Sequence, residues 1–293
     1  MEQSILRHFL SKRRGKGSPV LKKVVKRILI SIPVLIGVVL AIFVMLRIVP
    51  GNPVTTMMGE HVNPAVIEKI SKEMGLDQPY YIQFLKYIAN ALRGDFGTSY
   101  RLNRNVTQII IEAFPNTVKL SLLAAAVSWL IGIVAGIVAA IRQNRLLDRL
   151  FMGCALMGVS MPVFMTALVL QYVFAFKLKW FPVSGFDSFR AMILPAIVLG
   201  WNSAGSIARM TRSNLVEIMQ EDYIRTARAK GLREYAVIIF HALKNAMLPV
   251  VTMMALQISS MLSGAVLTES VFGVPGIGRL AVNAIETRDM PLL

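Results

Sequence analysis

The sequence has almost no cysteine and few acidic residues. Its 293 residues include one cysteine, Cys154, and only 16 Asp and Glu against 32 Lys and Arg. A single cysteine excludes a disulfide within the chain, and Cys154, set in an apolar run, is predicted to be a small packing residue. Charged residues make up 16% of the chain, against about a quarter in soluble domains. This composition argues against an ordinary soluble domain.

The motifs of several enzyme classes are also absent from the sequence. It has no Gly-x4-Gly-Lys-Ser/Thr segment and therefore no P-loop for ATP. The three histidines, His8, His61 and His241, lie in separate segments without paired cysteines, and no metal site is predicted. No Gly-x-Ser-x-Gly elbow occurs. We therefore expect no catalytic residues and no cofactor bound by this chain.

Long apolar runs define the fold class. Five of them approach or exceed the roughly 20 residues that cross a bilayer as a helix. They are Ile28–Leu46, Thr117–Ile141, Leu150–Phe176, Ala191–Ala208 and Met247–Val271. The sequence thus predicts an all-α integral membrane protein with at least five spans.

Basic residues gather beside some of these spans. The tail 1–27, the turn 142–149 and the segment 209–246 together hold nineteen, against five in the loop 177–190 and the C-terminal segment. Because cytoplasmic loops carry the excess of Lys and Arg, these three segments and the N-terminus are predicted to be cytoplasmic. The net charge of +16 is assigned to the membrane surface and not to nucleic acid.

The segment 50–116 is predicted to be a helical insertion on the outer side. Asn63 and Pro64 suit the start of a helix that Gly75 ends. Asp77 suits the cap of a second helix that ends at Gly94. Two interpretations are open, a structural cap and a surface for an external partner.

Several residues inside the apolar runs carry hypotheses of packing or transport. Gly132 and Gly136 are spaced for close helix packing. A translocation path or gate is assigned to Gln171, Asn202, Gln257, Ser260, Glu269, Phe272 and Pro275. Polar side chains at membrane depth face a bundle interior or a water path, so hydrogen bonding between helices is an equal alternative. The glycines around Pro275 predict a bent outer constriction with Phe272 as its plug.

The cytoplasmic stretch 221–249 is too long for a simple turn. A helix is predicted over Ile224–Lys230, a break at Gly231, and a second helix over Glu234–Leu243. Such an element is shaped to dock on another protein. The alternative is an amphipathic helix that lies on the membrane.

The residues of this stretch resemble the docking loop of binding-protein-dependent ABC permeases of the dipeptide, oligopeptide and nickel family. The resemblance rests on Tyr223–Leu232, followed by His241–Asn245 and Leu248-Pro249. Four further pieces agree in order, namely Leu46–Pro53, Gly75–Pro79, Gly94–Gly97 and Glu269–Gly278. The similarity is to the first-permease type and runs from about residue 24 to the end.

The resemblance implies a type I ABC importer in a bacterial inner (plasma) membrane. The implied partners are a second permease subunit, two ATPase subunits that bind ATP and Mg, and an extracytoplasmic substrate-binding protein. The residues that would contact the ATPase subunit are Tyr223, Arg225, Thr226, Ala227, Arg228, Ala229, Lys230, Gly231, Leu232 and His241. In this hypothesis Ala227 permits close approach, the cations meet carboxylates of the partner, and Gly231 is the pivot.

Short peptides are the expected substrate, and nickel or a metal chelate is the alternative within the family. An ion-coupled secondary transporter would need a carboxylate at mid-membrane, and Glu269 lies near the end of a run. A structural scaffold would not need the stretch 221–249. Family members have a sixth span after the Glu269–Gly278 segment, and it is expected after Leu293.

Overall fold

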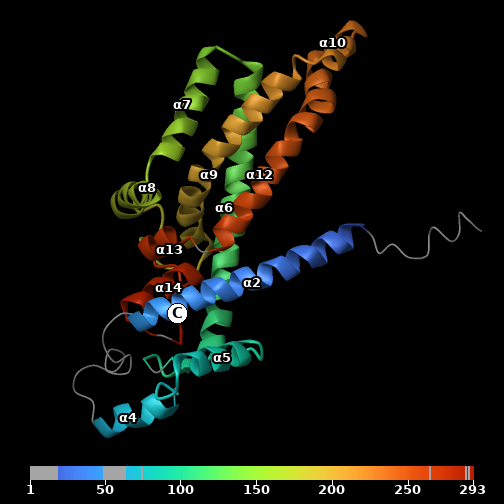
Figure 1. Cartoon of the computed structure of the whole chain (residues 1–293). Helices are drawn as coiled ribbons and strands as arrows, with labels where there is room; N and C mark the ends of the chain where they lie inside the picture. The colour runs from blue at the N-terminus through green and yellow to red at the C-terminus, as the bar shows by residue number, and fades with distance from the viewer. Residues whose placement is uncertain are drawn as a thin grey trace, which may run out of the picture. The chain divides into compact units, whose positions relative to one another are not determined.

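The computed structural model describes residues 19–48, 64–73, 75–99, 101–263, 265–287, 289 and 291–293. The chain forms two compact units, Met1–Gly94 and Asp95–Leu293 (Figure 1). Residues 1–18, which hold most of the predicted basic tail, lie outside the described residues, as do residues 49–53 of the Leu46–Pro53 match.

Within its described residues, the first unit contains three helices, α2 (Pro19–Ile48), α4 (Pro64–Glu73) and α5 (Tyr80–Ala91). Helix α2 begins at Pro19, so residues 19–27 of the predicted tail 1–27 are helical. Its apolar side chains are exposed, as at Leu35. The rings of Phe43 on α2 and Phe84 on α5 meet edge to face at 5.4 Å.

The two helices predicted within the segment 50–116 are present as α4 and α5. Gly75 and Gly94 follow them with φ of +66° and +78°, a conformation that glycine adopts without steric cost. The predicted cap of the second helix is wrong, because its N-cap is Pro79 and not Asp77.

The second unit is a helical bundle with one short β-ribbon. The ribbon pairs β1 (Thr98–Ser99) with β2 (Arg104–Asn105) in antiparallel register. The main helices are α6 (Val106–Ile141), α7 (Leu146–Ser160), α8 (Val163–Leu170), α9 (Phe189–Ile218) and α12 (Lys244–Leu262). The remaining elements are the π-helical η1 (Gln171–Lys177) and η2 (Val237–Leu243) with the short helices α10 (Asp222–Ala229), α11 (Glu234–Ala236), α13 (Val266–Phe272) and α14 (Ile277–Glu286).

Two glycines of α6 allow this helix to pack closely against α9. A Cβ atom added at Gly132 of α6 would lie 2.8 Å from the carbonyl oxygen of Ala204 on α9. One at Gly136 would lie 2.6 Å from the carbonyl oxygen of Ala208. The predicted close packing at these two glycines is therefore confirmed, with α9 as the partner.

The described part of the chain has four helices that are long and apolar enough to cross a membrane, at Lys22–Met45, Val106–Ile141, Phe189–Ile218 and Glu234–Leu262. A fifth span exists if α7 and the α8–η1 segment count as one, although they meet at a bend of 106°. The predicted span Leu150–Phe176 is therefore not one continuous helix. Pro162, the N-cap of α8, lacks the N–H that would continue the helix.

Two other predicted boundaries also move. Helix α6 begins at Val106 and not at Thr117, so the end of the 50–116 segment belongs to its first turns. The fifth run, predicted to reach Val271, ends at Leu262 of α12, and α13 is a separate helix. Apolar composition alone did not distinguish the end of α12 from the helix that follows it.

Candidate functional site

The stretch between α9 and α12 folds as predicted from its sequence, as a helix, a glycine and a second helical segment. Helix α10 precedes Gly231, and α11 and η2 follow it and lead into α12 (Figure 1). Gly231 has a φ of +78°, and an added Cβ would meet no atom within 4 Å. Glycine is therefore needed here for its backbone conformation and not for space.

One face of α10 packs against its own chain. Ile224 and Ala227 are buried in a cluster formed with Leu215 of α9 and with Val237, Ala242 and Ala246 of the following segment. The expectation that Ala227 offers close approach to a partner is therefore wrong. Its small side chain lets α10 approach the bundle of its own subunit.

An ion pair spans the glycine break. The Arg228 guanidinium donates to both carboxylate oxygens of Glu234, at 3.1 Å from Nε and 2.7 Å from Nη2. This hydrogen bonding raises the pKa of Arg228 above its ordinary value. Arg228 was expected to meet carboxylates of a partner, but here it closes the bend at Gly231. Tyr223 makes a second tie, since its hydroxyl accepts from Asn245 Nδ2 of α12 at 2.9 Å.

The opposite face of α10 is exposed. We call it the α10 outer face, and it consists of Asp222, Arg225, Thr226 and Ala229, spaced at three and four residues. Lys230 and Leu232 are exposed beside it. His241 is not part of this face, because it is half-buried on η2 with Nδ1 3.4 Å from the Ala236 carbonyl oxygen.

An exposed apolar group next to the bend was missed from the sequence. Tyr235, Ile239 and Phe240 are 60%, 47% and 62% exposed. The rings of Tyr235 and Phe240 lie 6.3 Å apart in an edge-to-face arrangement. The sequence predicted only a helix over Glu234–Leu243 here, and no exposed apolar surface.

Three of the proposed path residues form hydrogen bonds with backbone carbonyl groups elsewhere in this chain. The side-chain amide of Gln171 donates to the carbonyl oxygens of Val183 and Val271 at 2.8 and 3.1 Å. The side-chain amide of Asn202 donates to the Gly158 carbonyl oxygen at 2.8 Å. The side-chain amide of Gln257 donates to the Ser203 carbonyl oxygen at 3.1 Å. These contacts favour the alternative of internal hydrogen bonding, whereas Ser260 is exposed on α12.

Glu269 is fully buried at the end of the bundle that holds α13 and α14. Its carboxylate accepts from the Thr117 hydroxyl at 2.8 Å and from the Arg279 backbone N–H at 2.9 Å. The Thr117 hydroxyl also accepts from the Ile277 N–H at 2.8 Å. Glu269 therefore satisfies a free N–H in the first turn of α14, where the helix dipole favours negative charge.

The glycine-rich segment after α13 is shaped around this carboxylate. A Cβ at Gly276 would lie 2.5 Å from the Glu269 carboxyl carbon, and one at Gly278 would lie 2.9 Å from its oxygen. The Pro275 carbonyl oxygen accepts from Asn116 Nδ2 at 3.0 Å. The bent backbone predicted from the glycines is present, with a φ of +67° at Gly273.

Phe272 does not form a plug in this structure. Its side chain is 1% exposed and belongs to a core cluster with Leu120, Phe186 and Val274. An aromatic side chain buried among residues of its own chain stabilises this end of the bundle. It presents no surface to an open path.

The arrangement of apolar spans and an exposed, partly basic bend defines the class of protein. It is a type I ABC permease bundle, and solved structures of that class share the fold. Two structures of the MetNI methionine ABC transporter in inward facing conformations match with TM-scores of 0.53 and 0.52 at 15% identity. Each covers 63% of this chain, and the matches cover 85% and 87% of theirs.

The chain belongs to the family of binding-protein-dependent transport system inner membrane components. The family's main domain matches residues 132–293 of this chain. The separate N-terminal domain of such membrane components matches residues 20–121. The glutathione transport system permease protein GsiC of Escherichia coli (strain K12) is 43% identical over 93% of this chain and 89% of its own length. That of Salmonella paratyphi A is 42% identical with the same coverage.

These similarities identify the chain as a permease subunit of an ABC importer, of the dipeptide, oligopeptide and nickel class. Permeases of this family span the inner membrane several times and work with ATPase and substrate-binding subunits.

Proposed function

We propose that this subunit forms half of the translocation path for short peptides, with tripeptides of the glutathione type included. The observation that carries the proposal is the 43% identity to a glutathione permease over 93% of the chain. An identity that extends along nearly the whole chain includes the helices that would line the path.

The proposed assembly contains this chain, a second permease subunit, two ATPase subunits and an extracytoplasmic binding protein. ATP and Mg bind to the ATPase subunits, and the N-terminus of this chain is cytoplasmic. The α10 outer face and Lys230 dock in a groove of one ATPase subunit. Support comes from the exposure of this face and from the two ties, Arg228–Glu234 and Tyr223–Asn245, which hold it in a fixed orientation.

In this mechanism, closure of the ATPase subunits pulls on α10, and the pull passes into α9 and α12. Ile224 and Ala227 transmit the force because they are packed into the bundle. The glycine contacts between α6 and α9 make these helices move together. The result is rigid-body alternating access between two permease subunits.

Uptake by the purified complex in proteoliposomes tests the proposal. Radiolabelled dipeptides, tripeptides and glutathione are supplied with the binding protein outside and ATP inside, and radiolabelled nickel is supplied in parallel. We expect ATP-dependent uptake of at least one peptide and none of nickel. Nickel uptake without peptide uptake would replace the substrate proposal, and uptake driven by a proton gradient without ATP would overturn the assembly.

A further inference from the structure

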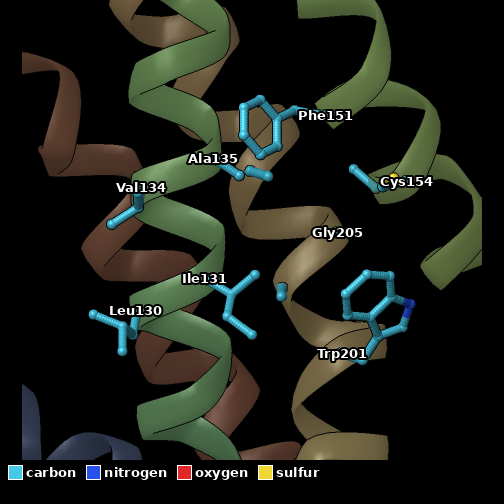
Figure 2. A pocket seen from close by; sticks show the side chains of 11 residues that line it. Leu130, Ile131, Val134, Ala135, Phe151, Cys154, Trp201 and Gly205 are labelled. Carbon is cyan, nitrogen blue, oxygen red and sulfur yellow. The ribbon is translucent and has the colours of Figure 1, made fainter. Parts of the chain in front are cut away.

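An apolar groove of about 410 Å³ lies between α6, α7 and α9. Figure 2 shows Ile131 of α6, Phe151 and Cys154 of α7 and Trp201 of α9 around it. It is separate from the docking bend and from the Glu269 cluster. In a bilayer such a groove must be filled by apolar groups. An empty groove would lose dispersion contacts, and a water molecule in it would find almost no hydrogen-bond partners.

The size of the groove favours a thin occupant. An α-helix with its side chains is about 10–12 Å wide and rises about 5.4 Å per turn. A space of this volume would therefore hold only about one turn of a second helix. A single hydrocarbon chain can follow an elongated groove along its length.

Two arginines lie on the α6–α7 turn, beyond the ends of the α6 and α7 segments that line the groove. Arg142 is the C-cap of α6, and Arg145 is the N-cap of α7. Arg142 lies about 10 Å along the helix axis from Ala135 in the groove wall. Both side chains are exposed, and neither takes part in an ion pair within the described ranges of the chain.

Asp148, the acidic residue nearest to this turn in the sequence, is already engaged. Asp148 accepts from Arg212 Nε and Nη2 at 2.6 and 2.7 Å and from the Asn144 N–H at 2.8 Å. It therefore leaves the positive charge of Arg142 and Arg145 without compensation. A guanidinium presents its donors in a planar fork that fits a phosphate group.

We propose that the groove binds an acyl chain of an anionic phospholipid whose phosphate lies against Arg142 and Arg145. The apolar lining takes the hydrocarbon chain, and the two guanidinium groups select a negative headgroup. The cytoplasmic leaflet, where the basic-residue pattern places this turn, supplies such lipids. The site is independent of which substrate is transported.

Photo-crosslinking in proteoliposomes of the whole transporter tests the proposal. Two probes carry a diazirine in the acyl chain, and one has a phosphatidylglycerol and the other a phosphatidylcholine headgroup. Mass spectrometry then quantifies labelling of the wall peptides around Leu130–Ala135 and Phe151–Ala155. We expect several-fold more labelling from phosphatidylglycerol.

Three variants sharpen the test. Arg142→Gln/Arg145→Gln should reduce phosphatidylglycerol labelling to the phosphatidylcholine level. The matched double variant Lys22→Gln/Lys23→Gln, which removes the same charge from exposed positions on α2, should leave it unchanged. Cys154→Trp adds bulk to an exposed wall position and should reduce labelling by both probes.

Equal labelling of the unaltered complex by the two probes would overturn the proposal. So would equal losses in the arginine and lysine double variants, which would indicate general surface electrostatics. No labelling of the wall peptides by either probe would also overturn the proposal, because lipid would then be excluded from the groove.

Discussion

The Thr117 hydroxyl on α6 donates to the Glu269 carboxylate on α13 at 2.8 Å, across 152 residues of sequence. The same hydroxyl accepts from the Ile277 N–H, and the other Glu269 oxygen accepts from the Arg279 N–H. One buried carboxylate thus joins three helices. It explains why glycines stand at positions 276 and 278, where a side chain would strike the carboxylate.

Replacing Glu269 with Ala should destabilise the subunit strongly. The change leaves the Arg279 N–H and the Thr117 hydroxyl without their acceptor, at about 1–3 kcal/mol for each buried unsatisfied group. Thermal unfolding of the detergent-solubilised complex measures the loss. Glu286→Ala on the exposed side of α14 is the control and should leave the melting temperature unchanged. Equal melting temperatures for the two variants would contradict the role of Glu269.

Gly276→Ala should also destabilise the subunit, and its effect should depend on Glu269. The added methyl group would lie 2.5 Å from the carboxyl carbon of Glu269. In the double variant Gly276→Ala/Glu269→Ala the space is vacated, so the combined loss should fall short of the sum of the single losses. A double-mutant cycle of melting temperatures measures this coupling. Simple additivity would mean that the glycine serves another purpose.

Gly231→Val should abolish uptake and release or uncouple the ATPase subunits while membrane insertion is preserved. A β-branched residue at a φ of +78° is strained by on the order of 1–2 kcal/mol, and no neighbouring atom prevents the substitution. Gly231→Asn is the matched control, because Asn tolerates this conformation better. It should retain more transport than the valine variant. Proteoliposome uptake and copurification of the ATPase subunits are the measurements.

If both Gly231 variants transported normally with bound ATPase subunits, α10 would be an interfacial helix without a docking role. Loss of membrane insertion in both would show that the bend is needed for folding.

Arg228→Glu and Glu234→Arg should each reduce uptake, and the double exchange should restore it in part. Both side chains are part-exposed, at 39% and 55%, so the pair adds less than about 1 kcal/mol to stability and acts on the shape of the bend. Melting temperatures should therefore change little while coupled ATPase activity falls. Failure of the exchange to restore uptake would indicate that Arg228 meets a carboxylate of the ATPase subunit after all.

Cysteine labelling tests the orientation. In a Cys154→Ala background, Tyr81→Cys on α5 and Lys230→Cys beside the α10 outer face introduce single exposed thiols. Position 81 should react with a membrane-impermeant maleimide in intact cells, and position 230 only after permeabilisation. The reverse pattern would place the N-terminus outside.

Much of this architecture was predictable because it depends on local chemistry. The apolar runs predicted the spans, and the glycines at 75, 94 and 231 predicted helix ends that the structure confirms. The pair Gly132 and Gly136 predicted close packing, although not the helix that approaches them. In each case the constraint is the steric freedom of one residue or the length of one apolar run.

The sequence by itself therefore determined a membrane-spanning helical chain with a glycine-broken bend between two spans, and it carried the resemblance to its family. Only the tertiary structure decided which way the side chains face. It turned Ala227 and Phe272 inward, paired Arg228 with Glu234, and brought Glu269 to Thr117. Residues of one type suit both a partner surface and a core, and the difference is set by packing between segments that are far apart in the chain.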